Sequence, residues 1–258
     1  MKASFLHLGD VHLGNEQYGR RERAEDFARA FYYAVEYAIQ HRVDFVVVAG
    51  DLFERSTLDP VTFDQTLSGL KQLAMADIPL VAIAGNHDRA RYGQGMAWLE
   101  SLGRQGFLLY LDAVNPEGII LRRWSPEEGV GGFVDLKGVR FVGMHYLGAS
   151  TARAIEELAE QLKKLQDRPS GGGTARPYTV ALLHAGLDGV VPNFRAELTY
   201  EQLSPLQGLV DYVALGHIHQ YYTREGWVYN PGSLETWNAG EIDWERGFLH
   251  VSVDGFSE

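Results

Sequence analysis

The chain is predicted to adopt a layered α/β fold rather than a helical bundle or a pure sandwich, because strand-like apolar runs alternate with amphipathic helical segments. Continuous apolar runs such as residues 46–49 are typical of strands buried on both faces. A chain of 258 residues with 45% hydrophobic content can also bury a large core. We therefore expect a single domain over residues 1–258.

Three helices are predicted from the spacing of apolar side chains, and a further apolar helix is expected around residues 96–102. The first covers about residues 22–40, where apolar residues recur at helical intervals. Asp59 and Pro60 provide a start signal for the second helix, which ends before Pro79. The third is centred on residues 155–165 and has one apolar face.

The remaining segments are predicted to be strands, turns and one Gly-rich loop. Short strands and turns are expected between about residues 106 and 146, and further strands after Trp227. The loop at 169–177 is expected to be mobile. It is not expected to be a domain boundary, because candidate site residues lie on both sides of it.

Five short segments place Asp, Asn and His together, and four of them follow strand-like apolar runs. These segments are residues 8–14, 49–54, 84–89, 182–186 and 215–220. Their polar side chains would gather along one edge of a sheet. The seven candidate metal ligands are Asp10, His12, Asp51, Asn86, His184, His217 and His219. Such a set fits a pair of divalent ions that hydrolyse phosphoesters.

The spacing of these residues indicates how two ions would be held. Asp51 is the candidate for a carboxylate that contacts both ions, because a buried strand delivers it to a glycine turn. Asp10 and His12 would leave a strand end and converge on a single ion. Alternation of side chains would direct His217 and His219 toward different ions.

The ligand types limit the metals. Oxygen and nitrogen ligands, with no cysteine in the chain, favour manganese, iron, magnesium, cobalt or a catalytic zinc over a structural zinc site. Asn86 would supply a neutral oxygen. Because seven other ligands already serve two ions, His87 is expected to face the substrate as an acid or electrostatic stabiliser. Asp88 is expected either to orient His87 or to begin a helix.

Other histidines are expected to have supporting or structural roles. His7 lies within the first strand, and a histidine that packs in the core or supports a metal ligand is expected there rather than an eighth ligand. His145 follows an apolar run and is interpreted in the same way. His41 is expected to end a helix, and His250 falls in the closing strand.

These residues resemble the calcineurin-like metallophosphoesterases, with all five motifs in order between Asp10 and His219. Within that superfamily the chain is most similar to the nuclease subunit of the SbcCD and meiotic-recombination-eleven type, which processes DNA ends. The narrower similarity rests on three segments: HLGNEQYGRRERAEDF (12–27), DYVALGHIH (211–219) and NPGSLETW (230–237).

The resemblance implies a finer picture of fold and site. The expected fold is a four-layer α-β-β-α sandwich of two mixed sheets, with metals at the strand ends. One metal would be held by Asp10, His12, Asp51 and His219. The other would be held by Asp51, Asn86, His184 and His217. His87 would be the catalytic histidine, and Mn²⁺ is the ion most expected.

The chain departs from this family in two respects. Glu54 stands where several relatives carry a histidine linked to exonuclease activity, so digestion of duplex ends becomes less expected. Relatives usually continue into a DNA-capping region and a segment that binds an ABC-type ATPase, whereas this chain stops at Glu258. It is expected to be a truncated or minimal member. DNA, a second copy and that ATPase are the implied partners.

Charge argues against a DNA nuclease, because the net charge is -11 and proteins that grip DNA usually present a basic surface. Local basic groups that could contact phosphates include Arg20, Arg21 and Arg89. A solvated helix face is the alternative for Arg20 and Arg21. Two other functions therefore stay open: a phosphodiesterase or phosphatase acting on a small molecule or nucleotide, and a non-catalytic scaffold.

The location of the protein is predicted from the lack of a recognisable signal peptide or membrane span in the sequence. The first residues reach Asp10 after only a short apolar stretch, which is too short for the core of a signal peptide. No run of about 18 apolar residues, the length of a membrane span, occurs in the sequence. We therefore expect a cytoplasmic protein with no membrane partner.

Overall fold

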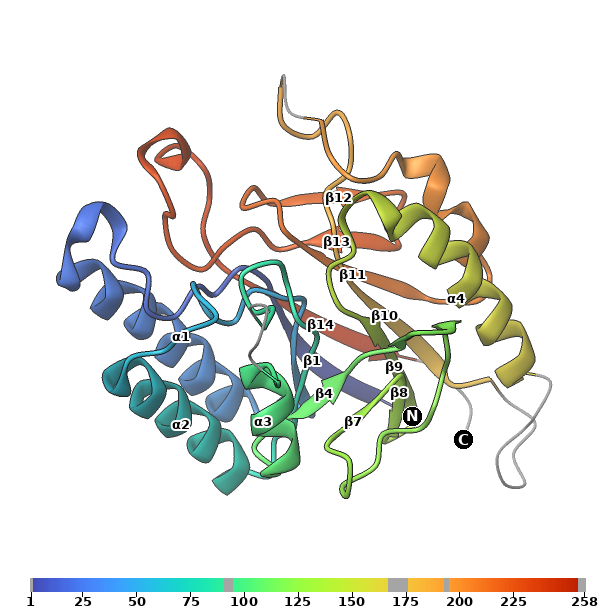
Figure 1. Cartoon of the computed structure of the whole chain (residues 1–258), viewed down its shortest axis with the longest axis horizontal. Coiled ribbons are helices and arrows are strands. Elements are labelled where there is room, and N and C mark those ends of the chain that lie inside the picture. Colours follow the sequence, from blue (N-terminus) through green and yellow to red (C-terminus); the bar gives the residue numbers. More distant parts are fainter. Residues whose placement is uncertain (1, 91–94, 167–175, 193–194, 255–258) are drawn as a thin grey trace.

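The computed structural model describes residues 2–90, 95–166, 176–192 and 195–254 (Figure 1). Most of the predicted Gly-rich loop, residues 169–175, lies outside them. The α-helices are α1 (Arg21–His41), α2 (Pro60–Met75), α3 (Trp98–Arg104) and α4 (Thr151–Gln166). Short 3-10 helices occur at η1 (Gln17–Gly19), η2 (Gly148–Ser150), η3 (Tyr200–Leu206) and η4 (Ala239–Glu241).

Within the described residues, the strands form two six-stranded mixed sheets and a small hairpin. The first sheet has the order β14 (Leu249–Asp254), β1 (Lys2–Leu8), β2 (Phe45–Val48), β3 (Leu80–Ala82), β4 (Leu109–Leu111), β7 (Val130–Gly131). The second has the order β12 (Tyr222–Arg224), β13 (Val228–Asn230), β11 (Tyr212–Gly216), β10 (Tyr178–His184), β9 (Val139–Met144), β8 (Phe133–Leu136). The hairpin pairs β5 (Val114–Asn115) with β6 (Gly118–Ile119).

Most neighbouring strands are parallel, and the antiparallel pairs lie at the sheet edges. In the first sheet only β14 runs antiparallel to its neighbour β1. In the second sheet β8 and β12 are the antiparallel edge strands. The central strands β1, β2, β3, β10 and β11 therefore deliver their carboxyl ends to a shared edge, where ligands gather in such folds.

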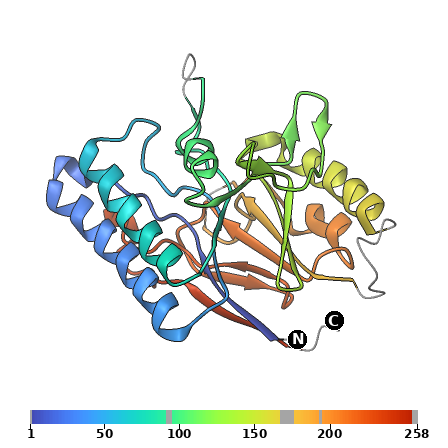
Figure 2. The same ribbon diagram turned by 90° about the horizontal axis from the view of Figure 1, so that it is seen from below.

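The two sheets face each other and helices cover their outer faces, as the two views in Figures 1 and 2 show. Three apolar layers hold this arrangement together. Leu6, Val46 and Leu80 point from the first sheet toward α1 and α2. Phe5, Val47, Val81, Phe141, Val180 and Leu182 fill the space between the sheets. Val142, Ala181, Val213, Ile155 and Leu158 join the second sheet to α4. The four-layer α-β-β-α sandwich is thereby confirmed.

The predicted helix boundaries have local causes. The side chain of Asp59 accepts hydrogen bonds from the backbone N–H groups of Val61 and Thr62, so α2 begins at Pro60 as expected. α1 ends at His41, because Arg42 adopts a left-handed conformation with φ of 50°. The region from 106 to 146 contains β4 to β9, as its pattern predicted.

The sheets approach most closely beside the strand ends that carry the polar motifs. A Cβ atom at Gly216 would lie 2.3 Å from the carbonyl oxygen of Ala49 on the opposite sheet. A Cβ at Gly9 would lie 3.4 Å from the Cα of Gly216. Small residues at these positions let segments 9–12 and 49–51 meet 216–219, so motifs from both sheets share one site.

Candidate metal centre

Four of the seven predicted ligands lie where the backbone turns sharply out of a strand. Asp10, His12 and Asp51 have φ of 51°, 50° and 51°, and His217 has φ of 88°. Left-handed backbone conformations are uncommon for residues other than glycine and cluster at functional sites. The turn redirects each side chain from the sheet face toward the strand end. The left-handed backbone therefore lowers the free energy of unfolding at the positions where these groups are placed.

Asp10, His12 and His219 form the first group of donors. Their side chains are buried or nearly so, and the Nε2 atoms of His12 and His219 are 3.2 Å apart. Asp10 Oδ1 lies 3.7 Å from His219 Nε2 and 4.0 Å from His12 Nε2. Both oxygens of Asp10 accept from the backbone N–H of His217, which fixes the carboxylate.

Asn86, His184 and His217 form the second group. Asn86 Oδ1 lies 3.1 Å from His184 Nε2 and 3.1 Å from His217 Nδ1. His217 and His219 point toward different groups, as expected, but strand alternation is not the reason. β11 ends at Gly216, so the divergence comes from the left-handed turn at His217.

Asp51 lies between the two groups. Its Oδ2 atom is 3.2 Å from His184 Nε2 and 3.9 Å from His12 Nε2, while Oδ1 accepts from the backbone N–H of His87. Burial opposes ionisation of this carboxyl, but the neighbouring imidazoles, first among them His184, hold its pKa below the usual range. An ionised carboxylate between two donor clusters occupies the position that a bridging ligand requires.

Each histidine has an acceptor behind the nitrogen that faces away from the donor cluster. His184 Nδ1 donates to the carbonyl of Ala49 at 2.7 Å. The acceptor carboxylates are Glu54 behind His12 at 3.0 Å, Glu241 behind His219 at 3.0 Å and Glu197 behind His217 at 3.1 Å. The Glu54 approach departs from ideal hydrogen-bond geometry. Metal-binding histidines characteristically donate their second N–H in this way.

The positions of the ring protons on His12 and His219 indicate whether these residues suit a bound cation. With the Nδ1–H of His219 donated to Glu241 and the Glu54 carboxylate 3.0 Å from His12 Nδ1, both Nε2 atoms present lone pairs toward each other and toward Asp10. Lone pairs held 3.2 Å apart repel unless a proton or a cation lies between them. The donor set, all nitrogen and oxygen, therefore fits divalent metal ions.

The protonation of His184 supports the same interpretation. Burial lowers its pKa, but the charges of Asp51 and Asp10 outweigh that effect and raise it to about 10. In the metal-free protein a proton therefore stands on this ring. A metal ion can replace that proton, because it satisfies the same carboxylates.

His87 borders the donor clusters without joining either of them. Its Nδ1 lies 2.8 Å from the backbone carbonyl of Glu54, and its ring meets the His12 ring edge to face at 4.9 Å. The side chain is 28% exposed and lines the cleft over the centre. Nε2 is therefore the ring nitrogen that a substrate can contact.

Asp88 has neither of the roles expected for it. Its oxygens accept from the backbone N–H groups of Leu52, Phe53 and Gly85, and not from His87. The backbone at residues 86–89 forms bends, and α3 begins only at Trp98. Burial and the Asp51 charge raise the pKa of Asp88 to about 6. The carboxyl group ties the second motif to the third, because it bonds backbone atoms of both.

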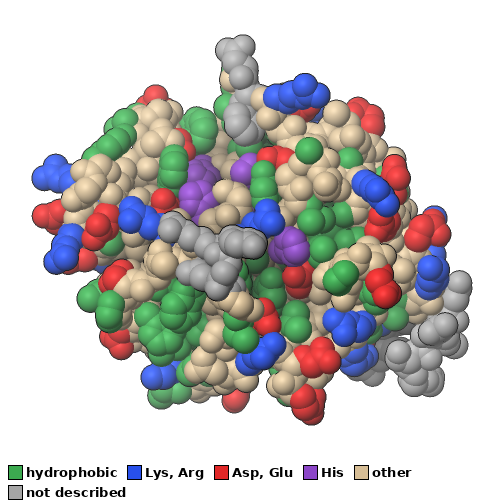
Figure 3. Space-filling model, viewed as in Figure 1, with side chains coloured by type: hydrophobic (Ala, Val, Ile, Leu, Met, Phe, Trp, Pro, Cys, Tyr) green, Lys and Arg blue, Asp and Glu red, His purple; other side chains and the backbone are tan. Residues whose placement is uncertain are grey.

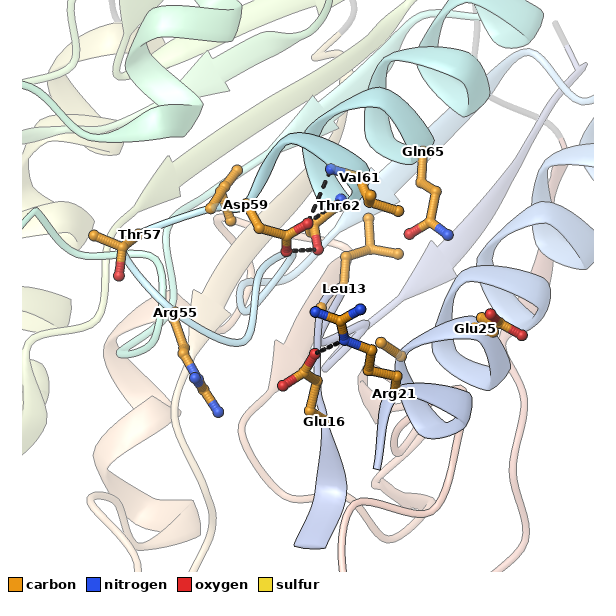
Figure 4. Close-up of a pocket in the computed structure, with 13 residues that line it drawn as sticks. Leu13, Glu16, Arg21, Glu25, Arg55, Thr57, Asp59, Val61, Thr62 and Gln65 are labelled. Carbon is orange, nitrogen blue, oxygen red and sulfur yellow. Dashed lines mark hydrogen bonds and ion pairs between the residues drawn. The ribbon is translucent and has the colours of Figure 1, made fainter. Parts of the chain in front are cut away.

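The predicted basic residues lie outside the cleft over the centre. Arg20 and Arg21 are exposed at the start of α1, where Arg21 lies 3.8 Å from Glu16. Arg21 lines a neighbouring groove of about 410 Å³ between α1 and the start of α2, shown in Figure 4. Arg89 is exposed and lines another pocket with His145. Their contact with substrate stays a prediction.

Sequence reasoning missed several residues that shape the centre. The cleft, about 330 Å³, opens where Figure 3 shows histidines gathered on one face. Trp237 lines this cleft and donates its Nε1–H to Glu54 Oε2 at 2.9 Å. Glu197 and Tyr146, on irregular segments, and Glu241, at the end of η4, were not identified as supports of the centre, because all three lie outside the five motifs. Only the NPGSLETW segment marked the neighbourhood of Trp237.

The other histidines have the packing roles that were expected, with one difference. His7 is buried and lies within hydrogen-bond distance of the Tyr212 hydroxyl and the Leu215 carbonyl. His145 is only half-buried and pairs with Asp112 at 2.8 Å, so it is not a core residue. His250 is exposed and contacts Tyr37 on α1.

The sequence profile of the calcineurin-like phosphoesterase family matches residues 3–221. The chain belongs to this family, and it is a metal-dependent hydrolase by class, as its motifs indicated. Among solved structures, TT1561 of Thermus thermophilus is 14% identical with a TM-score of 0.55, and 91% of each chain is covered. A dimetal phosphatase from Danio rerio is 16% identical with a TM-score of 0.50, covering 90% of this chain and 88% of that chain. At these identities the two structures support the fold alone.

Curated relatives are more similar in sequence. The DNA double-strand break repair protein Mre11 of Archaeoglobus fulgidus is 34% identical over 242 residues, which is 92% of this chain and 51% of that protein. The protein of the same name from Aeropyrum pernix is 29% identical, covering 97% of this chain and 58% of that protein. The chain therefore spans little more than half the length of these relatives. Within the described residues no helix is long and apolar enough to cross a membrane.

Proposed function

We propose that the chain hydrolyses phosphodiester bonds in DNA with two divalent ions, Mn²⁺ being the expected pair. The observation that carries this proposal is Asp51, whose Oδ2 atom faces donors of both clusters. The ligands of the first ion would be Asp10, His12, Asp51 and His219. Those of the second would be Asp51, Asn86, His184 and His217. When bound, the ions would neutralise the phosphate and lower the pKa of a water.

His87 supplies the proton donor, a role that the two ions do not fill. Its Nδ1 engages the Glu54 carbonyl, so the ring is held with Nε2 toward the cleft. As an imidazolium it would donate the Nε2 proton to the leaving sugar oxygen while water attacks phosphorus and the P–O bond to that oxygen breaks. Trp237 and Glu54 keep His12 and His87 in place during this step.

The cleft favours a diester over a small monoester. Beside the donors it is lined by apolar and aromatic side chains, namely Val191, Ile218, Trp237 and Trp244. A phosphate flanked by two nucleosides would use such a wall, since sugars and bases pack on aromatic surfaces. The relatives named as DNA double-strand break repair proteins support DNA as the substrate.

The test compares three substrates in the same buffer. Metal-stripped protein is supplied with Mn²⁺ and given linear duplex DNA, circular single-stranded DNA or a phosphomonoester, with chelator and His87→Ala as controls. Cleavage of either DNA that requires Mn²⁺ is the expected result. Cleavage of the monoester with both DNAs intact would contradict the proposal and select a phosphatase instead.

The same assay resolves whether duplex ends are digested. Glu54 occupies its position with a carboxylate that contacts Trp237 and His12, a pairing with two N–H groups that a neutral histidine could not reproduce. Because the family resemblance links a histidine at this position to exonuclease activity, we propose that cutting within strands exceeds digestion from duplex ends. A faster loss of end-labelled duplex than of circular single strands would contradict this.

A second copy of the chain and an ABC-type ATPase are the proposed protein partners. Val61 and Met75 expose 65% and 87% of their surface on α2, and Met96 exposes 38% ahead of α3. Exposed apolar side chains on adjacent helices are suited to a twofold contact. Light scattering at increasing concentration measures whether a dimer forms, and a constant monomer mass would exclude it.

A cytoplasmic location is likewise proposed from the expected function.

A further inference from the structure

His217 differs from the other three histidines of the centre in the nitrogen that it turns toward the donors. His12, His184 and His219 all present Nε2. His217 instead places Nδ1 3.1 Å from Asn86 Oδ1, and its Nε2 lies 3.1 Å from Glu197 Oε1. Either nitrogen of an imidazole can bind a metal, so something outside the ring must decide which one does.

Glu197 is itself held firmly by groups from two other segments. Its Oε2 accepts from the backbone N–H of Gly186 at 3.0 Å, and its Oε1 accepts from the Tyr146 hydroxyl at 3.1 Å. The Tyr146 ring also packs against His217, with ring centroids 5.3 Å apart. Only 13% of the Glu197 side chain is exposed. A carboxylate fixed on three sides can impose one ring orientation on its partner.

We propose that Glu197 is a positioning residue that serves the second metal ion alone. It binds the Nε2–H of His217 and thereby directs the Nδ1 lone pair toward Asn86, where the second ion would lie. Glu241 is its counterpart for the first ion, because it accepts from Nδ1–H of His219. Neither glutamate contacts the histidine that the other one holds, so each ion has its own support.

The proposal rests on the proposed metal assignment, and its physical basis is charge and orientation. Removing the Glu197 charge makes His217 a weaker base and lets the ring turn. Loss of such a partner typically costs roughly 10- to 100-fold in metal affinity. Because the first ion has Asp10 and no contact with Glu197, its affinity should change much less. Unequal losses at two ions distinguish positioning from general destabilisation of the fold.

The experiment titrates Mn²⁺ into metal-stripped protein and records calorimetry and electron paramagnetic resonance spectra. The variants are Glu197→Gln, Tyr146→Phe and Glu241→Gln. Glu160→Gln is the matched control, because Glu160 is exposed on α4 and pairs with Lys163, away from the donor clusters. At two equivalents the parent protein and the control should show the spectrum of a coupled ion pair.

Glu197→Gln is expected to weaken the second ion about 10-fold or more and to show the spectrum of an isolated ion. Tyr146→Phe should weaken the second ion in the same direction by a smaller factor, and it carries the test if Glu197→Gln fails to fold. Glu241→Gln should weaken the first ion instead. A coupled pair with unchanged second-ion affinity in both Glu197→Gln and Tyr146→Phe would overturn the proposal, as would equal loss of both ions. If Glu197→Gln shows this selective loss while the parent protein, loaded with both ions, leaves DNA uncut, the nuclease proposal alone is contradicted.

Discussion

Individual side chains at this centre are set by their hydrogen-bond partners more than by their place in a motif. His87 and Asp88 are neighbours in sequence, yet His87 lines the cleft and Asp88 is buried against backbone N–H groups. The difference follows from protonation and shape. A carboxylate can satisfy several backbone donors at once, whereas an imidazole with one nitrogen engaged keeps the other for substrate.

His87→Ala is expected to lower kcat by about 100-fold or more, as removal of an acid or an electrostatic group does. Mn²⁺ binding should be retained, because the His87 ring only packs against His12 and directs its Nδ1 to the Glu54 carbonyl, while the backbone N–H that bonds Asp51 is kept in the variant. Steady-state kinetics with a metal titration on the same sample measures both quantities. Parent-like kcat in the variant would remove His87 from the mechanism, and loss of both ions would make it a ligand.

His7 is expected to make stability fall in acid. Burial lowers its pKa to about 3, whereas an unfolded histidine keeps its ordinary value of 6.5. The unfolded chain therefore binds the extra proton between those values, so the free energy of unfolding falls as pH drops from 6.5 toward 3. The slope from this group is at most about 1.4 kcal/mol per pH unit.

Urea unfolding of metal-stripped protein at several pH values measures that slope. His7→Gln should flatten it, even though the variant is less stable overall. His41→Gln is the matched control, because His41 is exposed at the end of α1. An unchanged slope in His7→Gln would show that other groups cause the acid sensitivity.

At the scale of single residues, sequence reasoning located the candidate ligands but not their supports. Asp10, His12 and Asp51 follow apolar runs, and the end of such a run marks the end of a strand in the sequence. Glu197 reaches the centre from an irregular segment and Glu241 from the end of the short helix η4, both outside the five motifs, so no pattern marked them. The wrong expectation for Asp88 has the same cause, since a turn that folds back onto residues 52 and 53 is a long-range contact.

The elements of the fold position the centre through turns that tolerate no side chain. A Cβ atom at Gly85 would lie 2.1 Å from Asp51 Oδ1 and 2.5 Å from its backbone nitrogen. Gly50 has φ of 94°, and a Cβ there would lie 2.3 Å from His184 Nδ1. The residues that follow β2 and β3 are thus packed directly against the Asp51 carboxylate and the His184 ring.

Gly85→Ala is expected to displace Asp51 and weaken Mn²⁺ binding at both ions by at least about 10-fold, because a shift of the shared carboxylate affects each. Overpacking of this kind also costs about 1–3 kcal/mol in stability. Gly95→Ala is the control, since among the described residues, its chain neighbours aside, no atom lies within 4 Å of its added Cβ. Calorimetric titration checks the outcome, and parent-like affinity would show that the site relaxes around the methyl group.

Helices were predicted closely and the pairing of strands was not. Asp59 and Pro60 carry their start signal in the local sequence, which is why α2 begins where expected. The order β12-β13-β11-β10-β9-β8 depends on contacts between distant segments, which apolar periodicity does not encode. Two sheets came from the resemblance alone. The division into one domain over residues 1–258 stays a prediction.

At the scale of the whole molecule, the net charge of -11 and the proposed substrate must be reconciled. Two divalent ions at the centre would supply positive charge where the phosphate binds. Trp237 and Trp244 would add uncharged contacts with sugars and bases. The fold itself depends on neither the ions nor these two tryptophans, because three apolar clusters hold its sheets and helices together. The chemistry therefore depends on a small region where the two sheets meet.

The most direct test of the whole account is an anomalous difference map from crystals of the Mn²⁺-loaded protein. The account expects two peaks about 3.5–4 Å apart, the separation of catalytic metal pairs. Asp51 should contact both peaks, with Asp10, His12 and His219 at one and Asn86, His184 and His217 at the other. A single peak away from Asp51, or no peak among these seven side chains, would contradict it.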